Sequence, residues 1–133
     1  MKYANNPFNI RYSALNNWKG QIGQSNGFCL FSDLSFGVRA CAYLLMRTYR
    51  KYGLVTYSQV IERFAPSSEN DTQNYVNNVC NALHVFPFDV LRTCGNYVGL
   101  MRVMAQIESK TRLSSEYILN VMIRFKLKPY GFE

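Results

Sequence analysis

The stretch SFGVRACAYLLMRTYRKYG, residues 35–53, decides the fold, because the spacing of the apolar residues becomes helical at its start. Apolar side chains recur along it at helical spacing, and basic residues fill its last turns, where the helix dipole favours cations. Asp33 or Ser35 is placed to cap the beginning, and Gly53 is placed to cap the end. The stretch therefore predicts a long amphipathic helix.

The preceding residues, 1–34, lack helical periodicity and are rich in Asn, Gly and aromatic side chains. Asn26-Gly27 predicts a turn, and residues 28–31, with the sequence FCLF, predict a short strand. Residues 10–12, with the sequence IRY, are a candidate for a second short strand. We therefore expect a small extended N-terminal lobe with one hairpin at most.

The residues after Gly53 contain further helix signals. A second helix is expected from Thr56 until Pro66 ends it, and a third from Asp71 or Thr72. After a break at residues 95–96, a fourth long helix follows, and the last begins near residue 114 or 115. The sequence thus predicts one domain, residues 1–133, of the α+β class, mainly α: a helical bundle with a small extended N-terminal lobe.

Composition narrows the functional classes. The chain is 48% hydrophobic, which argues against disorder, and its net charge of +7 favours a polyanionic partner. The cations are spread along the chain rather than clustered, so we expect no nucleic acid. No apolar run is long enough to span a bilayer, and the N-terminus has no signal-peptide pattern. The four cysteines are predicted to be buried free thiols, and no metal or cofactor is expected.

Two carboxylates stand out in the connector APSSENDT, residues 65–72. Glycoside hydrolysis uses one carboxyl as a general acid and a second as nucleophile, base or electrostatic stabiliser. Glu69 and Asp71 fit such a pair on a loop. Asp71 fits a helix cap at least as well, and for Glu69 a structural role and a catalytic role are equally supported.

The other acidic residues have ordinary explanations in the sequence. Glu108 and Glu116 lie in predicted helices near Lys110 and Arg112, so we interpret them as surface residues in ion pairs. Asp33 is a helix cap, and the remaining acids read as solvated or terminal residues. By elimination, Glu69 is the candidate general acid.

A carbohydrate platform is a second candidate feature. Trp18, the only tryptophan, lies in the polar stretch NNWKG, residues 16–20, after an Asn-rich start. Sugars stack on aromatic faces and bond to amide side chains, so this region is suited to glycan binding. The aromatics are equally suited to closing a small lobe with little core of its own.

Several motifs together resemble known proteins. Residues 5–11, with the sequence NNPFNIR, resemble an N-N-P-G-N-I-R opening, and WKG at residues 18–20 resembles the W-x-G that follows it. The segments FCLFS, GVRA and FAPSSENDT at residues 28–32, 37–40 and 64–72 complete the order. This order is similar to small bacteriophage and prophage proteins labelled virion structural proteins. It also resembles the bacterial glucosaminidase and lysozyme-like superfamily.

The lysozyme-like resemblance implies a peptidoglycan-cleaving enzyme that acts on glycan strands. In that superfamily the general-acid Glu precedes the Asn-rich motif, whereas residues 1–4 here contain no acid, and Phe8 replaces the usual Gly. The acid has therefore moved, with Glu69 as the candidate and Asp71 assisting, or the fold is retained without catalysis. The candidate substrate-binding residues are Asn6, Asn9, Arg11, Trp18, Arg39, Asn70 and Tyr75.

Three functions compete at this point. The first is a virion-associated muramidase, glucosaminidase or lytic transglycosylase, which a phage particle would deliver to the cell wall without a signal peptide. The second is a non-catalytic phage structural or adaptor protein on a lysozyme-like scaffold, with other virion proteins as partners. The third is a basic nucleic-acid-binding protein, which rests on charge alone.

Overall fold

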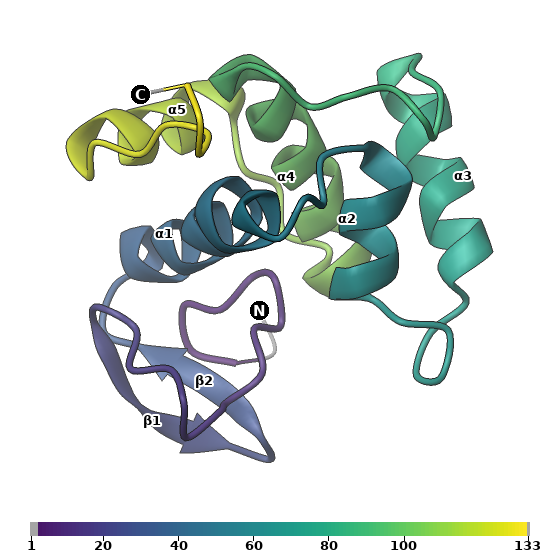
Figure 1. The fold of residues 1–133 in the computed structure, drawn as a ribbon. Coiled ribbons are helices and arrows are strands. Elements are labelled where there is room, and N and C mark those ends of the chain that lie inside the picture. Colours follow the sequence, from purple (N-terminus) through teal and green to yellow (C-terminus); the bar gives the residue numbers. More distant parts are fainter. Residues whose placement is uncertain (1–2, 133) are drawn as a thin grey trace.

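The computed structural model describes residues 3–132 and has five α-helices beside a two-stranded sheet (Figure 1). The predicted α+β class, mainly α, is therefore confirmed. The elements, in chain order, are β1 (Gln21–Ser25), β2 (Phe28–Phe31), α1 (Leu34–Tyr43), the π-helical segment η1 (Leu44–Tyr49), α2 (Tyr57–Phe64), α3 (Thr72–Leu83), α4 (Cys94–Ser109) and α5 (Ser115–Arg124).

The helix predicted from residues 35–53 forms as α1 and continues directly into η1. The Asp33 carboxylate accepts a hydrogen bond from the Ser35 backbone N–H at 3.0 Å, as the sequence predicted for this cap. Val38, Cys41 and Leu45 are fully buried, so α1 and η1 supply the centre of the core. Gly53 follows with a φ of +82°, which suits a glycine after a helix end.

The hairpin forms around Asn26 and Gly27, which both adopt positive φ, as a tight turn between twisted strands requires. The partner of β2 is β1, which the sequence analysis did not identify, because its Gln and Gly residues have low strand propensity. Residues 10–12, predicted as a possible strand, contribute only the isolated bridge from Arg11 to Phe28.

The predicted starts of three further helices are confirmed by their caps. Thr56, Asp71 and Ser114 each accept a backbone hydrogen bond at the beginning of α2, α3 and α5. The predicted break at residues 95–96 is wrong. Thr93 caps α4, and the Asn96 side chain closes the capping box, so both residues lie inside the first turn.

The N-terminal segment packs against the end of α4 and against α1. Ser109, the last residue of α4, donates a hydrogen bond to the Pro7 carbonyl at 2.7 Å. On the other side, a Cβ at Gly37 of α1 would overlap the Asn5 carbonyl oxygen, so glycine permits this close approach. Residues separated by about a hundred positions in the sequence are thereby held together, and the candidate site lies beside this junction.

Two further predictions concern the whole chain. The four cysteines are free thiols as the sequence predicted; Cys29, Cys41 and Cys80 are buried, whereas Cys94, also predicted as buried, is half-buried. Within residues 3–132, no helix combines the length and apolar character needed to cross a membrane.

Candidate functional site

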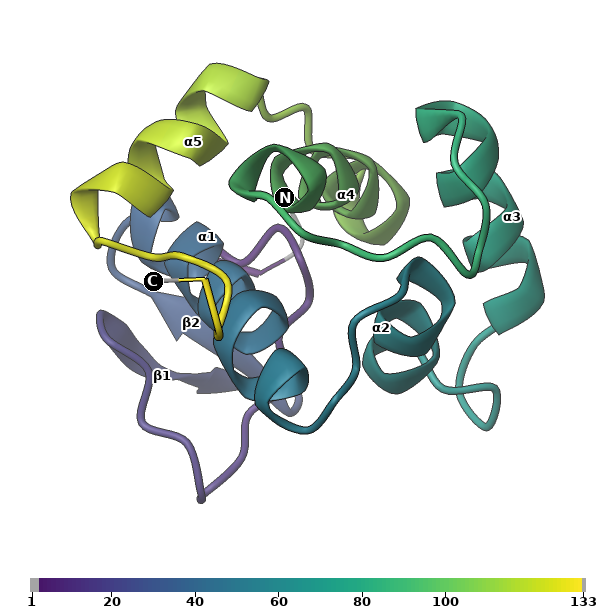
Figure 2. The ribbon, with the colours of Figure 1, turned by 45° about the horizontal axis from the view of Figure 1, so that its top comes forward.

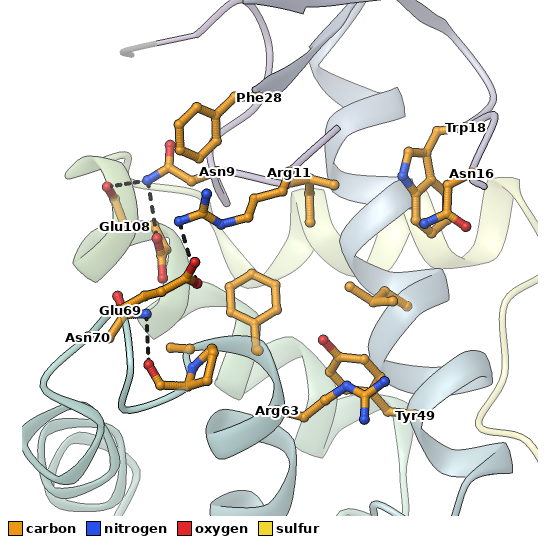
Figure 3. Close-up of a pocket in the computed structure, with 15 residues that line it drawn as sticks. Asn9, Arg11, Asn16, Trp18, Phe28, Tyr49, Arg63, Glu69, Asn70 and Glu108 are labelled. Carbon is orange, nitrogen blue, oxygen red and sulfur yellow. Dashed lines mark hydrogen bonds and ion pairs between the residues drawn. The ribbon is translucent and has the colours of Figure 1, made fainter. Parts of the chain in front are cut away.

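A groove of about 400 Å³ lies between the N-terminal segment, the connector from α2 to α3, and the end of α4 (Figure 3). The Asn5–Trp18 region and the Glu69 connector therefore line one groove. Its walls combine amides, two arginines, two carboxylates and aromatic rings. The lining residues are Asn9, Ile10, Arg11, Asn16, Trp18, Phe28, Leu44, Tyr49, Arg63, Phe64, Ala65, Pro66, Glu69, Asn70 and Glu108.

Glu108, near the C-terminal end of α4, is the partly buried carboxyl of this groove. The Asn9 amide nitrogen donates to its Oε1 at 3.1 Å and to its backbone carbonyl at 2.9 Å, which fixes the side chain against the N-terminal segment. Burial raises the pKa of Glu108, although Asn9, the buried Tyr75 hydroxyl beside it and Arg11 act in the opposite direction. A carboxyl that retains its proton more readily than usual is suited to act as an acid.

A second cavity, of about 270 Å³, meets the groove at Glu108 and Asn70, which line both. Residues of α3, including Asn74 and Asn78, line its other side. Glu108 and Asn70 therefore lie where the two cavities meet.

Glu69 occupies a different environment from Glu108. Its carboxylate lies 3.6 Å from the Arg11 guanidinium, and the two side chains are 47% and 60% exposed. The turn that presents it is held by the Pro66 carbonyl, which accepts from the Glu69 and Asn70 backbone N–H groups at 3.0 and 3.1 Å. Because Arg11 also acts on Glu108, its guanidinium lies within reach of both carboxyls (Figure 3).

The structure brings together five of the nine residues predicted for the site. Two further predicted residues lie outside the groove: Asp71 is the N-cap of α3, and Tyr75 is buried. Both line the second cavity with Glu108. The five residues in the groove are Asn9, Arg11, Trp18, Glu69 and Asn70.

Asn6 and Arg39 lie elsewhere. Asn6 is fully buried, and its amide bonds to the backbone of Ile10 and Cys29, so it is unable to touch a ligand. Arg39 is not part of the groove lining and stacks its guanidinium over the Tyr43 ring, 5.3 Å from the centroid. The prediction of Asn6 as a substrate-binding residue is therefore wrong, since its polar atoms are used within the fold.

Glu108 is the site residue that sequence reasoning missed. It was interpreted as a surface residue paired with Lys110 or Arg112, and that interpretation is wrong, because its partner is Asn9. The contact joins residues 99 positions apart, so local spacing gives no sign of it. No signal in the adjacent sequence could have identified it, because the contact forms only when the N-terminal segment packs on the end of α4.

Replacing Arg11 with Met is expected to raise the pKa of Glu108, because the guanidinium favours the ionised carboxylate. The melting temperature should change by no more than about 2 °C, since the Arg11–Glu69 pair is largely exposed. A ¹³C NMR titration of the Glu108 carboxyl measures the pKa. Arg92→Met, at an exposed position outside the groove, is the matched control. A pKa that stays constant or falls would contradict this account of the site.

Comparison with known proteins connects the chain to a bacteriophage. It is 42% identical over 82 residues to Protein P5 of Pseudoalteromonas phage PM2, and the match covers 58% of this chain and 51% of the phage protein. The chain thus spans about half the length of this curated relative. No protein-family model matches the chain. The protein is therefore similar in sequence, over more than half its length, to a protein of a bacteriophage.

Proposed function

We propose that this protein is a component of a bacteriophage particle that cleaves the glycan strands of peptidoglycan, with Glu108 as the general acid. The placement of Glu108 supports the proposal more than any other single observation. The lysozyme-like resemblance calls for an acid just before the Asn-rich motif, and Asn9 of that motif holds the Glu108 carboxyl. The similarity to a protein of phage PM2 supports an origin in a phage particle.

The proposed reaction begins with a glycan strand laid across both cavities, so that a glycosidic oxygen faces Glu108. The protonated carboxyl donates its proton to that oxygen as the bond from the oxygen to the anomeric carbon breaks. The exposed Glu69 carboxylate, on the connector, stabilises the positive charge that develops on the sugar ring or activates a water that adds to it. The positive charge of Arg11 offsets the negative charge of the Glu69 and Glu108 carboxylates between these steps.

Trp18 and the amides would hold the sugars. Trp18 lines the groove, and its indole N–H and the side-chain amide oxygen of Asn9 are buried without a hydrogen-bond partner among residues 3–132. Buried polar atoms normally have partners, so a small movement of either side chain that brings these atoms to a sugar would satisfy them. Asn16 and Asn70 add donors and acceptors on two sides of the same groove.

Trp18→Ala is expected to weaken binding to purified sacculi by about 10-fold, because stacking of one ring against an aromatic face is lost. A co-sedimentation isotherm measures this binding. Phe88→Ala, an exposed aromatic residue outside the groove, is the control and should bind like the unaltered protein. Equal binding by Trp18→Ala would remove Trp18 from the site.

Absence of the protein from purified particles, measured by mass spectrometry, would overturn the proposal that it is a virion component.

A second candidate is a phage structural or adaptor protein that retains the groove without catalysis. The position of Arg11 favours this candidate. Its guanidinium lies 3.6 Å from the Glu69 carboxylate and also acts on Glu108, so it occupies the space between the two carboxyls that a substrate would have to enter. Dye release from labelled sacculi separates the two candidates. Steady release requires the enzyme, whereas binding to other virion proteins with no release from several wall types would favour the structural role.

A further inference from the structure

A second surface of the molecule, which we call the cationic-aromatic surface, consists of Arg39, Tyr43, Arg47, Lys51 and Tyr130. Arg39 lies over the Tyr43 ring at 5.3 Å, and Arg47 lies over the Tyr130 ring at 5.3 Å. Tyr43, Arg47, Lys51 and Tyr130 also border a hollow of about 260 Å³. Stacking on an aromatic face holds each guanidinium in place.

The fold assembles this surface from segments that are far apart in the sequence. The C-terminal segment lies along α1 and η1 (Figure 2), where the Tyr130 N–H donates to the Met46 carbonyl at 2.8 Å. The Arg47 guanidinium donates to the Lys128 carbonyl at 3.1 Å. The three cations come from one continuous stretch, residues 39–51, and the C-terminal segment adds Tyr130 from far along the chain.

The surface is continuous with the groove. Tyr43 packs edge-on against Trp18, with ring centroids 6.1 Å apart, and Trp18 itself lines the groove. Towards α5, Arg39 also lies 5.7 Å from the Phe125 ring, next to Arg124. Asp33, the N-cap of α1, interacts with Arg124 there, so this border also carries an acidic group.

We propose that the cationic-aromatic surface binds the anionic peptides that branch from a peptidoglycan strand held in the groove. This inference rests on the proposed function of that groove. Peptides leave the glycan at regular intervals, so a strand seated beside Trp18 must project some of them over the neighbouring face. Their carboxylates match the Arg39, Arg47 and Lys51 cations, and the tyrosine rings offer apolar contact to the peptide side chains.

The test compares soluble glycan strands that carry their peptides with strands stripped of peptides by an amidase. Unaltered protein should bind the peptide-bearing strands about 10-fold more tightly, a gain that charge contacts to two half-buried arginines and one exposed lysine can supply. Replacing Arg39, Arg47 and Lys51 together with Gln should abolish this preference and leave the affinity for stripped strands unchanged. Isothermal titration calorimetry gives each dissociation constant.

A matched control removes the same three charges elsewhere, from the exposed residues Arg92, Arg102 and Arg112. The control should retain the preference; equal loss in both triple variants would overturn the proposal in favour of net charge alone. Because Arg47 holds the C-terminal segment, the double variant at Arg39 and Lys51 repeats the test with that contact intact. It should lose at least half of the preference.

Failures of the two proposals are distinguishable. If the unaltered protein binds both kinds of strand equally, the surface is not a peptide site, although the groove still binds glycan. If it binds neither kind, the proposed function fails, and this inference fails with it. Tighter binding of single-stranded oligodeoxythymidine than of peptide-bearing strands, lost in the first triple variant only, would reassign the surface to nucleic acid.

Discussion

Replacing Asn6 with Leu is expected to destabilise the protein by about 4 kcal/mol, because three buried hydrogen bonds are lost while the branched shape of the side chain is kept. The Asn6 amide donates to the Ile10 and Cys29 carbonyls at 3.0 and 2.9 Å, and its oxygen accepts from the Ile10 N–H at 2.8 Å. Leucine would leave all three backbone groups without a partner in a fully buried place.

Thermal unfolding followed by circular dichroism measures the effect, which should exceed about 10 °C in melting temperature for a chain of this length. Asn120→Leu is the matched control, since Asn120 is exposed on α5 and should shift the melting temperature by about 2 °C or less. A small shift for Asn6→Leu would contradict the structural role and return Asn6 to the candidate binding residues.

The contrast between Asn6 and Asn9 explains why the site was only half predictable. The two residues belong to one Asn-rich motif, and the sequence assigned both to substrate binding. The chain folds so that Asn6 joins the N-terminal segment to β2, whereas Asn9 faces α4 and the groove. Which amide is used by the backbone depends on contacts with residues 23 and 99 positions away, and local sequence contains no information about them.

The helix starts were predictable for the opposite reason. Each N-cap side chain accepts a hydrogen bond from a backbone N–H two or three residues further on, so adjacent sequence is enough to predict its role. These caps are Asp33, Thr56, Asp71 and Ser114. The same locality misled the interpretation of residues 95–96. Gly95 suggested a break, but Thr93 and Asn96 form a capping box that begins α4 before it.

Replacing Glu108 with Gln is expected to reduce release of fragments from sacculi by about 1,000-fold, the scale of a lost general acid. Glutamine has nearly the same shape, and its carbonyl oxygen accepts the Asn9 hydrogen bond as Glu108 does. The variant should therefore keep its affinity for sacculi, so the loss appears in the rate rather than in binding. Glu116→Gln, on the exposed start of α5, is the matched control and should retain full activity.

Stability gives an independent check on the same carboxyl. Because burial raises the pKa of Glu108, the folded state disfavours its ionised form. Stability should therefore fall as pH rises from the unfolded-state pKa through the raised folded-state value, and stay lower above it. Glu108→Gln should remove this fall and be more stable than the unaltered protein at pH 7. Melting temperatures from pH 3 to 8 measure the difference.

The two measurements separate catalysis from structure at Glu108. If Glu108→Gln loses fragment release and gains stability at pH 7, the carboxyl serves function at a cost in stability. Replacing a purely structural residue would lower the stability instead. Glu69→Gln should reduce release by only about 10-fold if its exposed carboxylate assists rather than donates the proton. Complete loss in Glu69→Gln with full activity in Glu108→Gln would reverse the two roles. No release by the unaltered protein would favour the non-catalytic virion component.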